Sequence, residues 1–131
     1  MTLTLRTESS SPNRTTLWLQ GRLDAETFGE LDEALGTIMP TVADGGTLVL
    51  ELGALDYISS AGLRSFAKAR KAMRERHGHT LLLNPQPQVR KVFDIVKAVP
   101  VNEVFANTEE LDDYLDRMQR QVIEQQESGE G

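Results

Sequence analysis

Two neighbouring serines are the residues of this sequence best suited to chemistry by their types and position. Ser59 and Ser60 follow an apolar run that ends at Ile58, and a helical pattern begins directly after them. Free backbone amides and the helix dipole make the start of a helix a favourable place for an anion. If Ser59 is the N-cap, Ser60 is the first helical residue, and we expect its hydroxyl to face outward as a phosphate acceptor. The simpler interpretation is that both serines only cap the helix.

A phosphate on Ser60 would add negative charge to a chain that is already acidic. It contributes about −1.5 to −2 charges, and the formal net charge of the chain is −6. We expect the fold to tolerate this anion at the helix start, so that its effect is to repel a docked partner. Gly62 has no side chain that could block a partner, whereas Leu63 and Phe66 should point inward.

Apolar patterning on both sides of the serines predicts an α/β fold. Strands are predicted at residues 3–5, 15–19, 47–52, 80–83 and 101–105, and helices after Asp24, from Ser60, from Pro87 and from Asn107. A hairpin followed by alternating strands and helices indicates a mixed sheet of about four to five strands, with about four helices packed mainly on one face.

Cap residues mark two of the predicted helix starts. Asp24 is a candidate N-cap of the first helix, and Asn107 with Glu110 resembles a capping box. Negative charge near Glu110 also suits a first helical turn. We expect one domain over residues 1–122 and a polar tail over 123–131, disordered from Gln125 onward.

The composition excludes several classes of function. The 131 residues include no cysteine, which removes disulfides, thiolate catalysis and sulfur-ligated zinc. The acidic charge disfavours direct binding to nucleic acid or to anionic membranes. No apolar run approaches the roughly 18 residues that would span a bilayer, and the N-terminal residues lack an apolar signal-peptide core. These features predict a cytoplasmic protein.

Two motifs together resemble the STAS family, whose best-known members are anti-sigma factor antagonists. They are Gly21-Arg22-Leu23-Asp24 before the first helix and the run from Tyr57 through Ser59-Ser60-Ala61-Gly62 to Arg64. With the order of elements, the similarity covers about residues 3–122. The resemblance implies a partner-switching mechanism without catalysis or a cofactor in this chain. The unphosphorylated antagonist binds an anti-sigma factor, which frees a sigma factor for transcription, and phosphorylation of a serine ends that complex.

The resemblance also implies the partners and the site residues. The anti-sigma factor would be a serine kinase of the histidine-kinase-like ATPase type, and a metal-dependent, PP2C-like serine phosphatase would reset the switch. This chain would act as a monomer or weak dimer. In that family the acceptor serine lies two residues before the glycine, which corresponds to Ser60. Many members have aspartate immediately before the acceptor, where this chain has Ser59, so Ser59 is the alternative acceptor. The expected partner-binding residues are Leu23, Asp24, Ala25, Ser59, Ala61, Gly62, Leu63 and Arg64.

Four other interpretations stay open on the sequence. His77 and His79 flank a glycine, but no third metal ligand is convincingly placed, and solvated helix-end residues are the simpler explanation. A serine hydrolase would need a histidine base, and the Gly-x-Ser-x-Gly elbow is missing around Ser60. A non-catalytic STAS scaffold in a larger signalling or transport assembly is the main alternative to an antagonist. The basic residues of the helix after Ser60 could attract an acidic partner or could simply be solvated.

Overall fold

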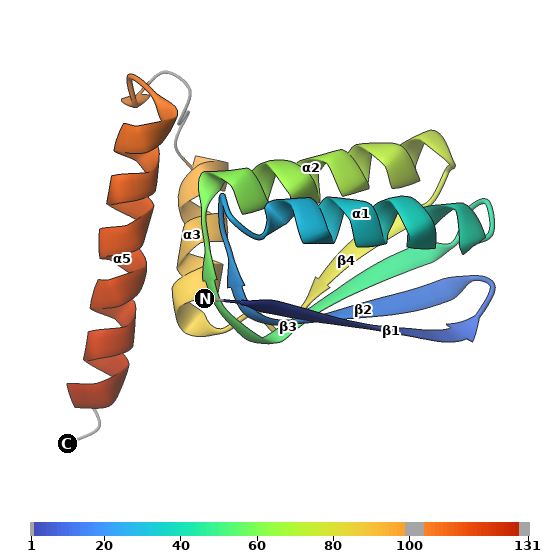
Figure 1. The fold of residues 1–131 in the computed structure, drawn as a ribbon, viewed down its shortest axis with the longest axis horizontal. Coiled ribbons are helices and arrows are strands. Elements are labelled where there is room, and N and C mark those ends of the chain that lie inside the picture. The colour runs from blue at the N-terminus through green and yellow to red at the C-terminus, as the bar shows by residue number, and fades with distance from the viewer. Residues whose placement is uncertain (1, 99–103, 129–131) are drawn as a thin grey trace.

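Four strands form one mixed sheet in chain order, β1-β2-β3-β4 (Figure 1). The structure is a computed structural model and describes residues 2–98 and 104–128. β1 pairs antiparallel with β2, whereas β2 with β3 and β3 with β4 are parallel. The strand bounds are Leu3–Ser11 for β1, Arg14–Leu23 for β2, Thr47–Ile58 for β3 and His79–Leu83 for β4.

The helices occupy two places around this sheet. Their bounds are Phe28–Ile38 for α1, Ser60–Glu75 for α2, Pro87–Ala98 for α3 and Thr108–Ser128 for α5, with a short 3-10 helix at Met39–Thr41. α1 and α2 lie side by side on one face, while α3 and α5 stand together at the end of the sheet where β2 and β3 terminate (Figure 1). The predicted α/β fold with a mixed sheet is confirmed. Within the described ranges, no helix has the length and apolarity to cross a bilayer.

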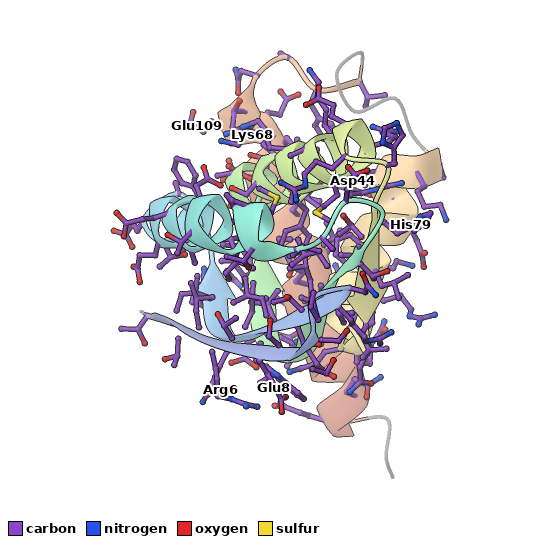
Figure 2. All side chains as sticks on the ribbon, turned by 90° about the vertical axis from the view of Figure 1, so that its right-hand side faces the viewer. Arg6, Glu8, Asp44, Lys68, His79 and Glu109 are labelled. Carbon is purple, nitrogen blue, oxygen red and sulfur yellow. The ribbon has the colours of Figure 1, made fainter. Side chains whose placement is uncertain are left out.

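The core lies between the sheet and the α1–α2 layer. Parallel register places Leu17 of β2 opposite Leu50 of β3, and both side chains are fully buried. Strand residues alternate between faces, so the residues between them point to the other side of the sheet. On that side Arg6 stacks on Trp18, with 4.6 Å from the guanidinium carbon to the ring centroid. Figure 2 shows Arg6 and Glu8 pointing away from the helices.

Two predicted features near helix starts have different outcomes. The Asn107–Glu110 cap is confirmed, because Asn107 Oδ1 accepts the backbone N–H of Glu110 at 2.8 Å. The N-cap role of Asp24 is wrong, because α1 begins at Phe28 after a turn. The Asp24 carboxylate accepts the N–H of Glu26 within that turn, at 3.0 Å.

The predicted disordered tail is also wrong over its described part. α5 continues to Ser128 instead of ending near Val122. Its residues are good helix formers, and Ile123 and Gln126 line a shallow depression with Gln86 and Pro87 at the start of α3. Of the predicted strand at 101–105, residues 101–103 lie outside the described residues, and Val104 is helical.

Among the described residues, no strand lies beside the second half of β3 on the α3 side. β4 pairs with β3 only from Thr47 to Glu51, whereas β2 follows β3 to Ile58. Buried backbone groups must find partners inside the protein. Here side-chain amides supply them, because Gln86 donates to the carbonyl of Gly53 at 2.9 Å and Gln88 donates to the carbonyl of Asp56 at 3.0 Å.

Gln119 of α5 forms hydrogen bonds with the last residue of this strand edge. Its Oε1 accepts the N–H of Ile58 at 3.0 Å, and its Nε2 donates to the carbonyl of Ile58 at 2.8 Å. The amide therefore pairs with Ile58 on both sides, as a neighbouring strand would. Gln119 is only 1% exposed, so water cannot replace these two bonds in the folded chain.

Replacing Gln119 by alanine should destabilise the protein strongly. Both backbone groups of Ile58 would lose their partner in a buried place, at a cost of about 1–3 kcal/mol each. The matched control is Gln121→Ala on the same helix, because Gln121 is exposed and should change stability by less than about 0.5 kcal/mol. Urea denaturation of both variants measures the difference, and equal midpoints would contradict the pairing.

Candidate functional site

The serine pair lies where β3 ends and α2 begins. Ser59 is the N-cap with extended backbone angles, and Ser60 is the first residue of α2, as predicted. The carbonyl of Ser59 accepts the N–H of Leu63 at 3.0 Å, which forms the first turn of the helix. The N–H of Ser59 donates to the carbonyl of Leu23 at 2.9 Å. The junction is thereby fixed to the end of β2.

Both hydroxyls are buried, so the predicted outward-facing Ser60 is wrong for this conformation. Ser60 is 3% exposed and Ser59 is 4% exposed. Neither Oγ has a hydrogen-bond partner among the described residues, and Ser59 makes no side-chain cap. A buried hydroxyl without a partner costs about 1–3 kcal/mol. This pair of serines therefore weakens the fold at this point instead of stabilising it as ordinary caps would.

The first turns of α5 cover the junction. Asp112 Oδ1 accepts the backbone N–H of Ser60 at 2.8 Å, across 52 positions of sequence. This carboxylate stands at the positive end of the α2 dipole. It occupies the place at the helix start that was predicted for a phosphate on Ser60. Nothing in the local sequence reveals this contact, because the two residues are far apart in the chain.

Gly62 packs inward instead of keeping the surface clear. A Cβ built on Gly62 would lie 2.7 Å from Leu23 Cγ and 2.9 Å from Ile58 Cγ1. The missing side chain lets α2 approach the ends of β2 and β3. The predicted role of Gly62 in a partner's approach is therefore replaced by a packing role.

Several carboxylates lie near Tyr57, just before the serine pair. Arg22 lies over the ring of Tyr57, with 3.9 Å to the centroid, and bonds Asp24 Oδ2 at 3.4 Å. The pKa of Tyr57 is raised, chiefly by burial, then by the negative charge of Asp116 with smaller contributions from Asp112 and Asp24, against the lowering effect of Arg22. The acidic residues of α5 thus act at the same place as the Gly21–Asp24 motif.

The predicted partner-binding residues do not form one exposed patch. Ala25 and Arg64 are exposed, and Asp24 and Leu63 are half-buried. The buried members are Leu23, Ser59, Ala61 and Gly62. A groove of about 330 Å³ runs beside Ser60 between α2 and α3, with Leu63, Arg64 and Phe93 among its lining residues and Leu111 of α5 at its border.

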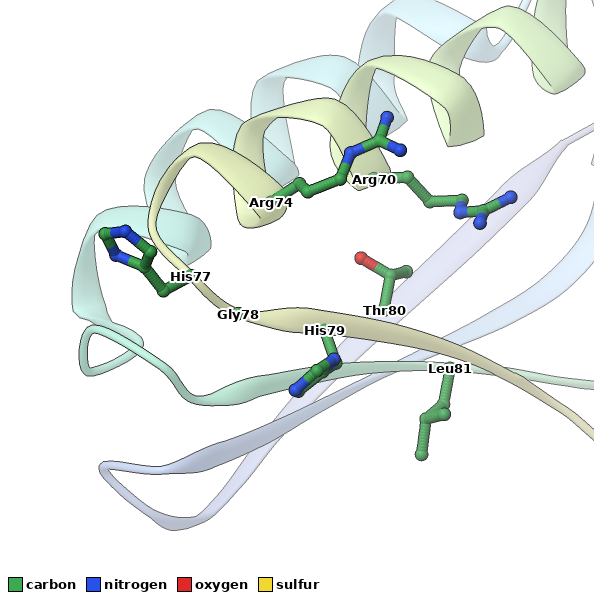
Figure 3. Close-up of a pocket in the computed structure, with 7 residues that line it drawn as sticks. All are labelled: Arg70, Arg74, His77, Gly78, His79, Thr80 and Leu81. Atoms are coloured by element: carbon green, nitrogen blue, oxygen red, sulfur yellow. The ribbon is translucent and has the colours of Figure 1, made fainter.

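The histidines lie at the other end of α2 from the serines. A helix of this length spans about 24 Å, so neither His77 nor His79 can serve Ser60 as a base. A basic pocket of about 600 Å³ lies there, with the Arg70 and Arg74 side chains above Thr80 (Figure 3). His77 and His79 point away from its centre. In the described part of the chain, no three His, Asp or Glu side chains are grouped to hold a metal.

The chain belongs to the STAS domain family, whose model matches residues 7–111. Two curated relatives carry related descriptions. BtrV of Bordetella bronchiseptica, named as a candidate anti-sigma factor antagonist, is 50% identical over 37% of this chain and 41% of its own length. The anti-sigma-B factor antagonist of Listeria monocytogenes is 24% identical over 79% of this chain and 90% of its own length.

Solved structures agree with the fold. The unphosphorylated form of the anti-sigma factor antagonist SpoIIAA matches with a TM-score of 0.58 and 24% identity, over 70% of this chain and 82% of its own. The phosphorylated form of SpoIIAA, from Bacillus, matches with a TM-score of 0.59 and 23% identity, over 74% and 86%. At this identity the likeness supports the STAS fold alone.

A side chain at position 62 should force the β2–α2 packing apart. Gly62→Ala places a methyl group against Leu23, and overpacking of this kind costs about 1–3 kcal/mol. Gly36→Ala in α1 is the matched control, because nothing lies within 4 Å of its Cβ position; it should raise stability by about 0.5–1 kcal/mol. Thermal unfolding of the two variants gives opposite signs if this packing is correct.

Tyr57 should ionise above its ordinary pKa of 10.0. The pKa of Tyr57 in the folded protein exceeds its value in the unfolded chain. Ionisation of Tyr57 should therefore leave the free energy of unfolding unchanged below pH 10 and lower it as pH rises toward the folded pKa. Removing a negative charge with Asp116→Asn should bring the Tyr57 pKa part of the way back. Phenolate absorbance, with Tyr57→Phe to assign the signal, tests this. A pKa of Tyr57 unchanged by Asp116→Asn would place α5 elsewhere.

Proposed function

We propose that this protein is an anti-sigma factor antagonist that is switched by phosphorylation of Ser60. Membership of the STAS family and the descriptions of the curated relatives support the class. The observation that carries the site is the place of Ser60, at the first position of α2 and two residues before Gly62. Ser59 is the alternative acceptor. SpoIIAA, which shares the fold, has been solved in a phosphorylated form.

The chemical step requires only a hydroxyl from this chain. Ser60 Oγ attacks the γ-phosphorus of ATP, and the new O–P bond forms as the bond from that phosphorus to the ADP oxygen breaks. The hydroxyl proton passes to a base of the kinase, and ADP leaves. ATP and magnesium belong to the kinase, so this chain acts as a substrate and needs no cofactor of its own.

The proposed cycle has two partners in the cytoplasm. The unphosphorylated protein, as a monomer or weak dimer, binds a serine kinase of the histidine-kinase-like ATPase type that otherwise holds a sigma factor. The docking surface would centre on Ala25, Leu63 and Arg64 around the groove beside Ser60. Phosphorylation ends this complex, and a PP2C-like phosphatase restores the starting state.

One observation favours the alternative of a non-catalytic STAS scaffold. The Ser60 hydroxyl is buried away from solvent, and a serine that is always buried would have only a structural role. Light scattering coupled to size-exclusion chromatography separates the two functions, because a scaffold forms a large assembly with copies of itself. An antagonist elutes as a monomer or dimer.

Phosphorylation should occur on one residue of the serine pair. The protein is incubated with ATP and a candidate serine kinase of the histidine-kinase-like ATPase type, and the phosphopeptide is sequenced by mass spectrometry. We expect one phosphate on Ser60, complete loss of labelling in Ser60→Ala, and retention of labelling in the matched control Ser59→Ala. Labelling that persists in Ser60→Ala would move the acceptor to Ser59 or beyond the pair, and absence of labelling in every form would remove the switch.

A further inference from the structure

A closed Ser60 hydroxyl cannot react with ATP where it lies. In-line transfer needs Oγ within reach of the γ-phosphorus with no protein group between them. Oγ of Ser60 is shielded, while Asp112 of α5 holds the backbone N–H of the same residue. The strand and helix that carry the serine form the centre of the fold, so the covering element is the part that must move.

We propose that α5 is a regulatory cover over Ser60 that must open before phosphorylation and that the phosphate then keeps open. This inference rests on the proposed function for its biological meaning. Two contacts define the closed state at the junction, namely Asp112 with the N–H of Ser60 and Gln119 with the backbone of Ile58.

The placement of α5 suits a part that can separate from the rest. It is the outermost helix and contacts the body along one side, mainly against α3 (Figure 1). Leu115 and Gln119 are its fully buried residues among those described, while Arg117, Arg120 and Gln121 are exposed. Segments with few buried contacts open locally at lower free energy than the core.

Charge explains why a phosphate would prevent closure. The Asp112 carboxylate already stands at the amino end of α2, where a phosphate on Ser60 would have to lie. A phosphate there would repel the Asp112 carboxylate, and Asp116 adds negative charge nearby, as its effect on the pKa of Tyr57 indicates. Arg64 lines the same groove as Ser60 and is exposed, so a cation lies near the position that a phosphate on Ser60 would take outside the closed junction.

A single cysteine makes the cover measurable without any kinase. The 131 residues contain no cysteine, so Ser60→Cys introduces the only thiol among them. Its reaction rate with Ellman's reagent reports how often Oγ would be accessible. Ala67→Cys, at an exposed position on the same helix, supplies the rate of an open thiol. We expect Ser60→Cys to react at least about tenfold more slowly, because reaction must wait for local opening.

Loosening α5 should release the protected thiol. Adding Gln119→Ala to Ser60→Cys should raise its rate by about tenfold or more, and adding Gln121→Ala should not. If Gln119→Ala unfolds the chain, as circular dichroism would show, Asp112→Ala replaces it. Equal rates for Ser60→Cys and Ala67→Cys, or no acceleration in any folded α5 variant, would overturn the cover.

The charge effect is tested by two adducts of similar size. Alkylating Ser60→Cys with iodoacetate leaves a negative group, whereas iodoacetamide leaves a neutral one. Hydrogen exchange along α5, followed by mass spectrometry, should be faster in the negative adduct. Equal exchange would show that size, and not charge, opens the helix, and would overturn the proposed effect of phosphate.

The cover and the proposed function can fail separately. A protected thiol that Gln119→Ala releases, in a protein that no kinase labels, would support the cover and remove the antagonist switch. A freely reactive thiol in a protein that is labelled on Ser60 would do the opposite.

Discussion

The pairing of Gln119 with Ile58 is the interaction on which the site depends. β3 extends beyond its last partner in β4, so its final backbone groups would lie unpaired inside the protein. One amide of α5 satisfies both groups of Ile58 and fixes this helix against the strand end. Ser59 and Ser60 follow Ile58 directly, so α5 holds both the strand end, through Gln119, and the start of α2, through Asp112.

The same junction carries an unfavourable feature. Two hydroxyls lie buried without hydrogen-bond partners among the described residues. Each departs from what a stable core favours, since buried polar groups normally find hydrogen bonds. Departures of this kind are common where a protein must change state. The buried serine pair therefore lowers the stability of the junction at Ser59 and Ser60.

Local patterns allowed the sheet, the α2 start and the Asn107 cap to be predicted from the sequence, because each depends on neighbouring residues. The role of Asp112 could not be predicted, because it contacts a residue 52 positions away. The burial of Gln119 could have been noticed in the sequence, because Gln119 continues the helical spacing of the apolar residues Leu111 and Leu115. A polar residue at such a buried position needs hydrogen-bond partners. The tail was misjudged from its polar composition, although its glutamines and glutamates also favour helix.

The prediction that Ser60 is exposed was wrong. The sequence indicates the position of Ser60 on the helix, but it does not indicate which residues pack over its side chain. Hydrogen exchange of the Ser60 backbone N–H by NMR tests most directly whether α5 closes the β3–α2 junction. The structure predicts slow exchange in the wild-type chain and fast exchange in Asp112→Ala, with the amides of β2 unchanged. Rapid exchange of the Ser60 N–H in the wild-type protein, at the rate of an open peptide, would contradict the closed junction.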